Sequence, residues 1–109
     1  MNSQGFVMMA EGSQIDWVNH CNDFEDALEQ TLAFDSTVRK ARDYAQSDGS
    51  TLAAAIADHK TGGMALIGGA RDASTLFAAW TIERPRAATM PFYACGPGAP
   101  HLFTFADQA

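Results

Sequence analysis

Apolar residues along this chain fall into two patterns, one long periodic stripe and several short continuous runs. The stripe extends from Asp23 to about Gln46, where apolar side chains recur every three or four residues and therefore share one face of an α-helix. Asn22 or Asp23 can cap its start, and acidic side chains in the first turn suit the positive end of the helix dipole. The helix is expected to end at Ser47-Asp48-Gly49, because glycine often ends a helix. We therefore predict one long helix.

The continuous apolar runs predict strands. Phe6 to Ala10 is the kind of run expected of a strand that is buried on both faces. Thr51 to Ala57 predicts a second buried strand, although its alanines also allow a helix. Weaker strand candidates, separated by turns rich in Gly or Pro, are Met64 to Ile67, Thr75 to Thr81 and Met90 to Cys95. The order strand, helix, strand implies a right-handed crossover and a parallel pair in a layered α/β sheet.

This predicted sheet has too few helices to cover it. A parallel sheet needs helices on both faces, and the sequence offers one long helix. We therefore expect an open face or edge to be covered by something that these 109 residues do not contain. The length is that of about one domain, so the expected organisation is a single partial domain, residues 1–109.

Composition and charge narrow the class of protein. A content of 47% hydrophobic and 18% charged residues is typical of a globular chain. The net charge of −6, from seven Lys and Arg against thirteen Asp and Glu, argues against nucleic-acid binding. No run approaches the ~20 apolar residues of a membrane helix, and the first residues lack the features of a signal peptide. Cys21 and Cys95 can form one bridge or remain reduced, and ordinary free thiols are favoured.

Polar residues with metal-ligand chemistry follow both predicted buried strands. Functional groups in open α/β sheets gather beyond the carboxyl ends of the strands, so adjacent parallel strands would bring these segments to one rim. In a helical turn, Asp16 and His20 would share one face and reach a single ion. Asp58 and His59 can converge on one ion where the chain turns off the sheet. Glu11 adds a hard oxygen ligand suited to magnesium or zinc.

These five ligand-type residues include no thiolate, which favours zinc or magnesium over copper or iron–sulfur chemistry. Each pair alone has a simpler interpretation, because D-x-x-x-H is usually a solvated helix face and an Asp-His pair is usually a turn. Their shared position at two strand ends is what favours a metal site.

Three segments of the chain resemble the C-terminal portion of the alkaline phosphatases. They are Phe6 to Asp23, Ala57 to Gly63 and Pro91 to Ala99, and they run through nearly all of the chain in the family's order. The E-G-S-x-I-D-x-x-x-H block is the specific part of the likeness. The resemblance implies a largely parallel sheet with helices, as part of a three-layer alkaline phosphatase-like sandwich.

The resemblance also implies a set of metal ligands. Glu11 matches the family's magnesium ligand. Asp16 and His20 match two ligands of the first zinc, and Asp58 and His59 match two ligands of the second zinc, which activates a serine nucleophile. In the family, the two zinc ions act on a phosphomonoester substrate. A periplasmic or extracellular location, and a homo-oligomer or a complementing chain that covers the exposed sheet, are expected on the same basis.

Two departures from the family pattern change what we expect of this chain. Pro85 stands where the first zinc normally takes another histidine, and His101 is a weak candidate to replace it. The upstream segments that carry the nucleophile have no match, because Asp35-Ser36 falls within the predicted helix. We therefore predict an alkaline phosphatase-like chain that is inactive alone. The alternatives are a non-catalytic metal-binding or interaction module derived from that fold and, less favoured, a sister metal hydrolase such as a sulfatase or phosphoglycerate mutase.

Overall fold

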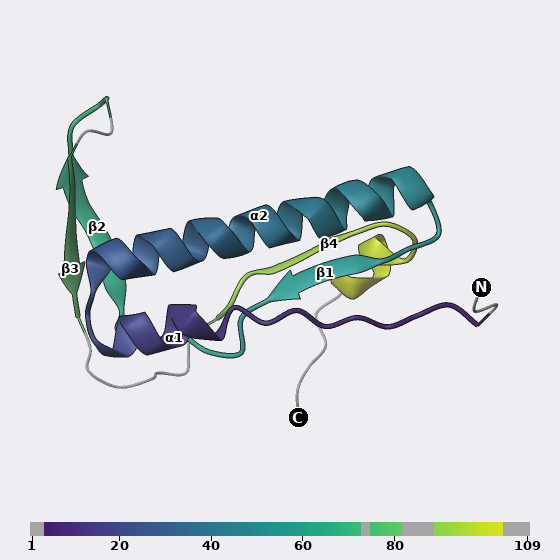
Figure 1. Ribbon diagram of the computed structural model, residues 1–109, viewed down its shortest axis with the longest axis horizontal. Coiled ribbons are helices and arrows are strands. Elements are labelled where there is room, and N and C mark those ends of the chain that lie inside the picture. The colour runs from purple at the N-terminus through teal and green to yellow at the C-terminus, as the bar shows by residue number, and fades with distance from the viewer. Residues whose placement is uncertain (1–3, 73–74, 82–88, 104–109) are drawn as a thin grey trace.

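The computed structural model describes residues 4–72, 75–81 and 89–103, and Figure 1 shows their arrangement around one long helix. A two-stranded sheet runs along this helix, and a separate hairpin stands beside its N-terminal end. The elements in chain order are α1 (Ser13–His20), α2 (Phe24–Asp48), β1 (Ala53–Ile56), β2 (Met64–Gly69), β3 (Leu76–Trp80), β4 (Phe92–Cys95) and the short 3-10 helix η1 (Ala99–Phe103).

Helix α2 confirms the periodic stripe and both of its predicted ends. The Asp23 side chain caps the first turn by accepting a hydrogen bond from the backbone N–H of Asp26 at 3.1 Å. The helix ends at Gly49, whose φ of 71° is left-handed and carries no steric penalty in glycine. Ala27 and Ala45 on the apolar face are buried.

The strand predictions at residues 51–57, 64–67, 75–81 and 90–95 are confirmed, but the pairing differs from the expectation. Strand β1 pairs with β4 in antiparallel register, from Ala53 opposite Cys95 to Ile56 opposite Phe92. Strands β2 and β3 form their own antiparallel hairpin. Both sheets in the described part of the chain are therefore small and antiparallel, and the predicted parallel pair is not found there.

The prediction of a buried strand at Phe6 to Ala10 is wrong for this structure. The segment is extended and assigned to no strand, and its side chains are exposed: Val7 is 101% and Met9 is 89% accessible. An extended segment becomes a strand only beside another strand, and among the described residues none pairs with it. β1 is likewise not fully buried. Half-buried and exposed positions alternate along it, because α2 contacts this sheet from one side only.

The hydrophobic core is small. Among the described residues, the buried apolar side chains are Ala27, Ala45 and Ala99, and no large side chain is fully buried. The Cα radius of gyration is 16.8 Å, against about 13 Å for a compact domain of this length. Large apolar side chains are therefore exposed, as expected for a sheet with too few helices to cover it. No helix in the described ranges combines the length and the apolar character needed to cross a membrane.

Candidate metal centre

The carboxyl end of β1 points toward α1, and the loop that follows β1 meets this helix (Figure 1). Helix α1 contacts α2 and half-buries Ile15 and Val18, while Asp16 and His20 stay partly accessible. The Asn19 side chain donates a 2.6 Å hydrogen bond to the Ile15 carbonyl within the helix. The prediction that a helical turn places Asp16 and His20 on one face is therefore met by the local structure.

Asp16 and His20 form the first carboxylate–imidazole pair. Asp16 Oδ2 lies 3.5 Å from His20 Nε2, and the two side chains are 38% and 45% exposed. The helix spacing of four residues accounts for this approach, since side chains at i and i+4 are neighbours on the helix surface.

Asp58 and His59 form the second pair, in the loop after β1. Asp58 Oδ2 lies 3.4 Å from His59 Nε2. Asp58 is 88% exposed, whereas His59 is 41% exposed and turns its other ring nitrogen toward α1. Consecutive residues converge here because the chain has left the strand, where their side chains would point to opposite faces.

Thr61 joins the two pairs. The Thr61 hydroxyl donates to Asp16 Oδ1 at 2.5 Å, and Thr61 Oγ1 also lies 3.1 Å from His59 Nδ1. Asp16 Oδ1 and His59 Nδ1 are 4.0 Å apart. We refer to Asp16, His20, Asp58, His59 and Thr61 as the polar cluster. Sequence analysis missed Thr61, although a hydroxyl residue two positions after the Asp-His pair and directly before Gly62-Gly63 was the available signal.

The turn that follows Thr61 is held tightly. Gly62 is buried with a φ of 70°, and a Cβ at this position would lie 2.7 Å from both the Asn19 carbonyl oxygen and the Trp80 ring. The Gly63 carbonyl accepts two hydrogen bonds from Thr81, at 3.3 Å from the backbone N–H and at 2.8 Å from the hydroxyl. The turn is therefore clamped between α1 and the end of β3, which fixes the position of Thr61.

The spacing within each carboxylate–imidazole pair fits the ligands of one cation better than a direct hydrogen bond. A charged N–H···O bond is about 2.7–2.9 Å long, shorter than the 3.4 and 3.5 Å found here. Two ligands bound at about 2.0–2.1 Å on a tetrahedral zinc ion are about 3.3–3.4 Å apart. Imidazole nitrogen and carboxylate oxygen are also preferred zinc donors. Each pair thus fits two of the four corners of a zinc site.

Neither pair is a complete site by itself. In residues 4–72, 75–81 and 89–103, no group of three or more His, Cys, Asp or Glu side chains is arranged to hold a metal ion. Glu11, the predicted magnesium ligand, is exposed just before α1 and forms no ion pair with the polar cluster among the described residues. Pro85 lies outside the described residues.

His101 and the two cysteines lie apart from the polar cluster. His101 belongs to η1, which Figure 1 shows at the far end of β4 from α1. Cys21 is exposed and Cys95 is half-buried, and both are free thiols as the sequence favoured. The structure thus brings together four of the five predicted ligands, Asp16, His20, Asp58 and His59. The fifth, Glu11, makes no ion pair with them among the described residues, and the weaker candidate His101 lies away from them.

Ser36 lies in the middle of α2, as the helix prediction required. Its hydroxyl donates to the Leu32 carbonyl at 3.1 Å, and the neighbouring Asp35 pairs with Arg39 at 3.0 Å. Both side chains of the Asp-Ser dipeptide therefore make contacts within the helix. This agrees with a structural role for Ser36.

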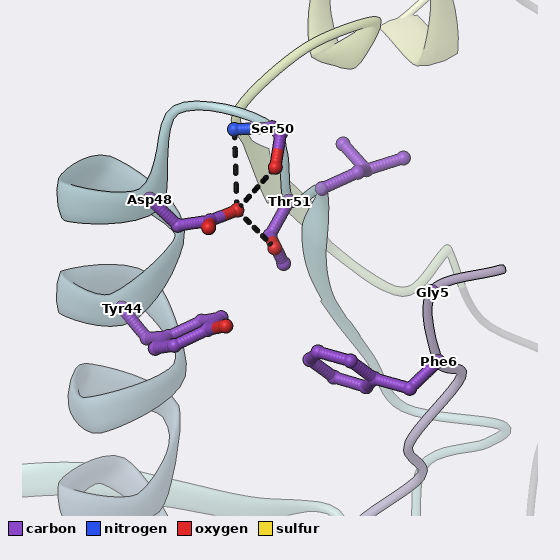
Figure 2. A pocket seen from close by; sticks show the side chains of 7 residues that line it. Gly5, Phe6, Tyr44, Asp48, Ser50 and Thr51 are labelled. Atoms are coloured by element: carbon purple, nitrogen blue, oxygen red, sulfur yellow. Dashed lines mark hydrogen bonds between the residues drawn. The ribbon is translucent and has the colours of Figure 1, made fainter. Parts of the chain in front are cut away.

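A cavity of about 340 Å³ lies at the opposite end of α2 (Figure 2). There the Phe6 and Tyr44 rings face each other with centroids 6.2 Å apart. The Asp48 carboxylate accepts hydrogen bonds from the hydroxyls of Ser50 and Thr51, both at 2.6 Å, and these lower the pKa of Asp48. No imidazole lines this cavity. Its lining comes from the N-terminal segment, the last turns of α2 and the residues that lead into β1.

The sequence model of one protein family, alkaline phosphatase, matches residues 1–103 of the chain. The chain belongs to the alkaline phosphatase family. Alkaline phosphatase 3 of Bacillus subtilis is 43% identical over 65 residues, which are 60% of this chain and 14% of that protein. The repressible alkaline phosphatase of Saccharomyces cerevisiae is 39% identical over 64 residues, 58% of this chain and 11% of that protein.

Solved alkaline phosphatases share the fold of this chain. The enzyme from the Antarctic bacterium TAB5 superposes with a TM-score of 0.73 at 31% sequence identity, over 82% of this chain and 28% of that chain. A mutant of the TAB5 enzyme with bound magnesium superposes with a TM-score of 0.72 at the same identity and coverage. The chain thus has an α/β alkaline phosphatase-like fold, and it spans about a quarter of the solved enzyme it matches.

Proposed function

We propose that this chain supplies the metal-ligand part of the active site of a metal-dependent phosphomonoester hydrolase. Membership of the alkaline phosphatase family supports a phosphatase-like function at the coarse level. The observation that carries the finer proposal is the convergence of the two carboxylate–imidazole pairs, each with the donor spacing of a zinc site.

In this proposal, Asp16 and His20 hold one zinc ion, Asp58 and His59 hold a second, and Glu11 holds magnesium. When bound, paired metal ions would lower the pKa of the attacking oxygen and stabilise the leaving oxygen of a phosphate ester. The 4.0 Å between Asp16 Oδ1 and His59 Nδ1 supports the proposal by placing the two pairs next to each other. The polar cluster orients its donor atoms before any metal arrives.

The exposed apolar surface supports a requirement for further polypeptide. The Phe6 to Ala10 segment and the outward side chains of β1 and β4, such as Ile56 and Tyr93, are accessible. We propose that a complementing chain or a second copy covers them and completes the largely parallel, three-layer sandwich. The chain alone would lack turnover, because covalent phosphoryl transfer needs a nucleophile that its sequence does not match. A periplasmic or extracellular location belongs to the same proposal.

Zinc titration and a complementation assay test this function together. Calorimetry on the 109-residue chain is expected to show zinc binding that Asp16→Ala weakens. In the complementation assay, this chain is mixed with a partner polypeptide. The partner is alkaline phosphatase 3 of Bacillus subtilis, from which the segment that matches this chain has been removed. We expect neither polypeptide alone to hydrolyse 4-nitrophenyl phosphate, and the mixture to do so with added zinc and magnesium.

Rapid, metal-dependent hydrolysis by the chain alone that survives Ser36→Ala would contradict the requirement for a second polypeptide. The absence of zinc binding, both alone and in the mixture, would contradict the ligand assignment.

A non-catalytic metal-binding or interaction module is the second candidate. The exposed strand faces favour it, since unpaired edges and apolar faces promote association with another polypeptide. The same assay separates the two functions. A module would bind zinc or change its oligomeric state with the partner, and hydrolysis would not appear.

A further inference from the structure

We propose that Thr61 is a positioning residue that decides which ring nitrogen of His59 is available to a ligand. The groups of the polar cluster differ in the number of protons that they can donate. Thr61 has one hydroxyl proton, and an ionised carboxylate such as that of Asp16 can only accept. The 2.5 Å contact between Thr61 Oγ1 and Asp16 Oδ1 therefore uses the hydroxyl proton.

The second contact of Thr61 then has a defined direction. Thr61 Oγ1 lies 3.1 Å from His59 Nδ1, and with its proton committed to Asp16 the hydroxyl can only accept there. His59 Nδ1 must consequently carry a hydrogen. In neutral His59 the lone pair is then on Nε2, the nitrogen that lies 3.4 Å from Asp58 Oδ2. Thr61 thus selects the tautomer that turns an electron pair toward the Asp58 carboxylate.

This tautomer places two acceptors, His59 Nε2 and Asp58 Oδ2, 3.4 Å apart with no proton between them. Two acceptors at that distance are favourable when a cation lies between them. The statement about zinc rests on the proposed function. The statement about the tautomer does not, because it follows from the hydrogen bonds of the protein alone.

Thr61 also orients the first pair. By engaging Asp16 Oδ1, it leaves Asp16 Oδ2 as the oxygen that faces His20 Nε2 at 3.5 Å. One hydroxyl therefore sets one donor atom in each pair. The hydroxyl is itself well placed for this, because the Gly62-Gly63 turn packs against Asn19 and Trp80 and leaves little room for it to move.

Nitrogen-15 NMR of the metal-free chain tests the tautomer directly, at a pH at which the histidines are neutral. The two-bond couplings from the ring nitrogens to the ring protons report which nitrogen of His59 is protonated. We expect the Nδ1–H form in the unmodified chain and in Thr61→Ser, which keeps the hydroxyl. Thr61→Val, which removes it at nearly constant volume, is expected to shift His59 to the Nε2–H form.

Two results would overturn the proposal. One is the Nε2–H form of His59 in the unmodified chain, and the other is the Nδ1–H form of His59 in a folded Thr61→Val chain. Thr37→Val is the matched control, because the Thr37 hydroxyl donates only to the Ala33 carbonyl of its own helix among the contacts described. This variant is expected to leave the His59 signals as they are in the unmodified chain. A backbone amide spectrum establishes that each variant is folded.

Zinc affinity supplies the second measurement. Loss of a group that orients a metal ligand weakens binding by about 10–100-fold, so Thr61→Val is expected to fall in that range. Thr61→Ser and Thr37→Val are expected to bind as the unmodified chain does. A folded Thr61→Val chain with unchanged zinc affinity would overturn the role toward zinc. If the unmodified chain binds no zinc while the NMR difference is present, the proposed function fails and the role of Thr61 toward His59 stands.

Discussion

The two ends of α2 differ in how much of the surrounding surface is packed within this chain. At the N-terminal end, α1 and the loop after β1 form a cluster with short polar contacts, and the adjoining turn is tightly packed. Along the C-terminal half, large apolar side chains of the N-terminal segment and of the strands remain accessible. The polar cluster is thus supported by its immediate neighbours, whereas the apolar side chains stay exposed.

This difference shows that a cluster of polar side chains can form in a chain with a small core. A helix spacing of four residues, a turn with buried glycines and one threonine hydroxyl take part in bringing four ligand-type side chains together. The hydrophobic effect operates over a larger scale, because burial of apolar side chains needs a second layer of structure.

Substitution of the exposed apolar segment should have the largest effect, and only on association. Val7→Ser, Met8→Ser and Met9→Ser together remove three apolar side chains, each worth about 1.5–3 kcal/mol when buried. Half-saturation of the complementation assay should therefore need roughly 10³-fold more partner, or a still larger excess, since the lower value of about 1.5 kcal/mol for each side chain already gives this factor. The metal-free chain should keep its unfolding midpoint, since these side chains are exposed.

Lys40→Ser, at an exposed position on α2, is the control for that triple variant. Unchanged complementation by the triple variant would show that the N-terminal segment is not part of the surface that the partner covers.

Removal of a ligand should have the next largest effect, confined to the polar cluster. His59→Ala should lower zinc affinity by more than about 100-fold, the upper end of what loss of a supporting group produces. His101→Ala should leave zinc affinity unchanged, because η1 lies at the far end of β4. Calorimetric titration of both variants provides the comparison. Equal losses in the two variants would place His101 in the site.

The packing of the turn beside Thr61 can be separated from its backbone strain. Gly62 and Gly49 have nearly equal φ values, 70° and 71°, but only Gly62 has neighbours that an added Cβ would meet. Gly49→Ala should lower the free energy of unfolding by about 1 kcal/mol through strain alone. Gly62→Ala should add an overpacking term and reach about 3 kcal/mol. Urea unfolding gives both values, and equal losses would show that the turn is not tightly packed.

The smallest predicted effect lies at the other end of α2, at Asp48. The hydroxyls of Ser50 and Thr51 lower the pKa of Asp48, with Ser50 the larger cause, so Ser50→Ala should raise that pKa toward its ordinary value. A lowered pKa in the folded state stabilises the protein above the ordinary pKa of 3.8, and this contribution is lost as the pH falls through the folded value. An NMR titration of the Asp48 carboxyl measures the shift. Thr37→Val should leave it unchanged.

Sequence reasoning was most successful where the determining contacts are local. The α2 helix followed from its apolar period and its caps, and the Asp16–His20 face followed from helix geometry. Strand pairing was missed because it depends on which strands are present, and Phe6 to Ala10 pairs with no strand among the described residues. Thr61 was missed because its importance comes from two contacts that only the folded chain brings together.

Anomalous X-ray scattering at the zinc edge, from crystals of the chain soaked with zinc, tests the assigned ligands most directly. We expect one peak at about 2.0–2.2 Å from Asp16 Oδ2 and His20 Nε2, and a second at the same distance from His59 Nε2 and Asp58 Oδ2. Zinc bound only at the Cys21 thiol or at His101, with the polar cluster empty, would contradict it.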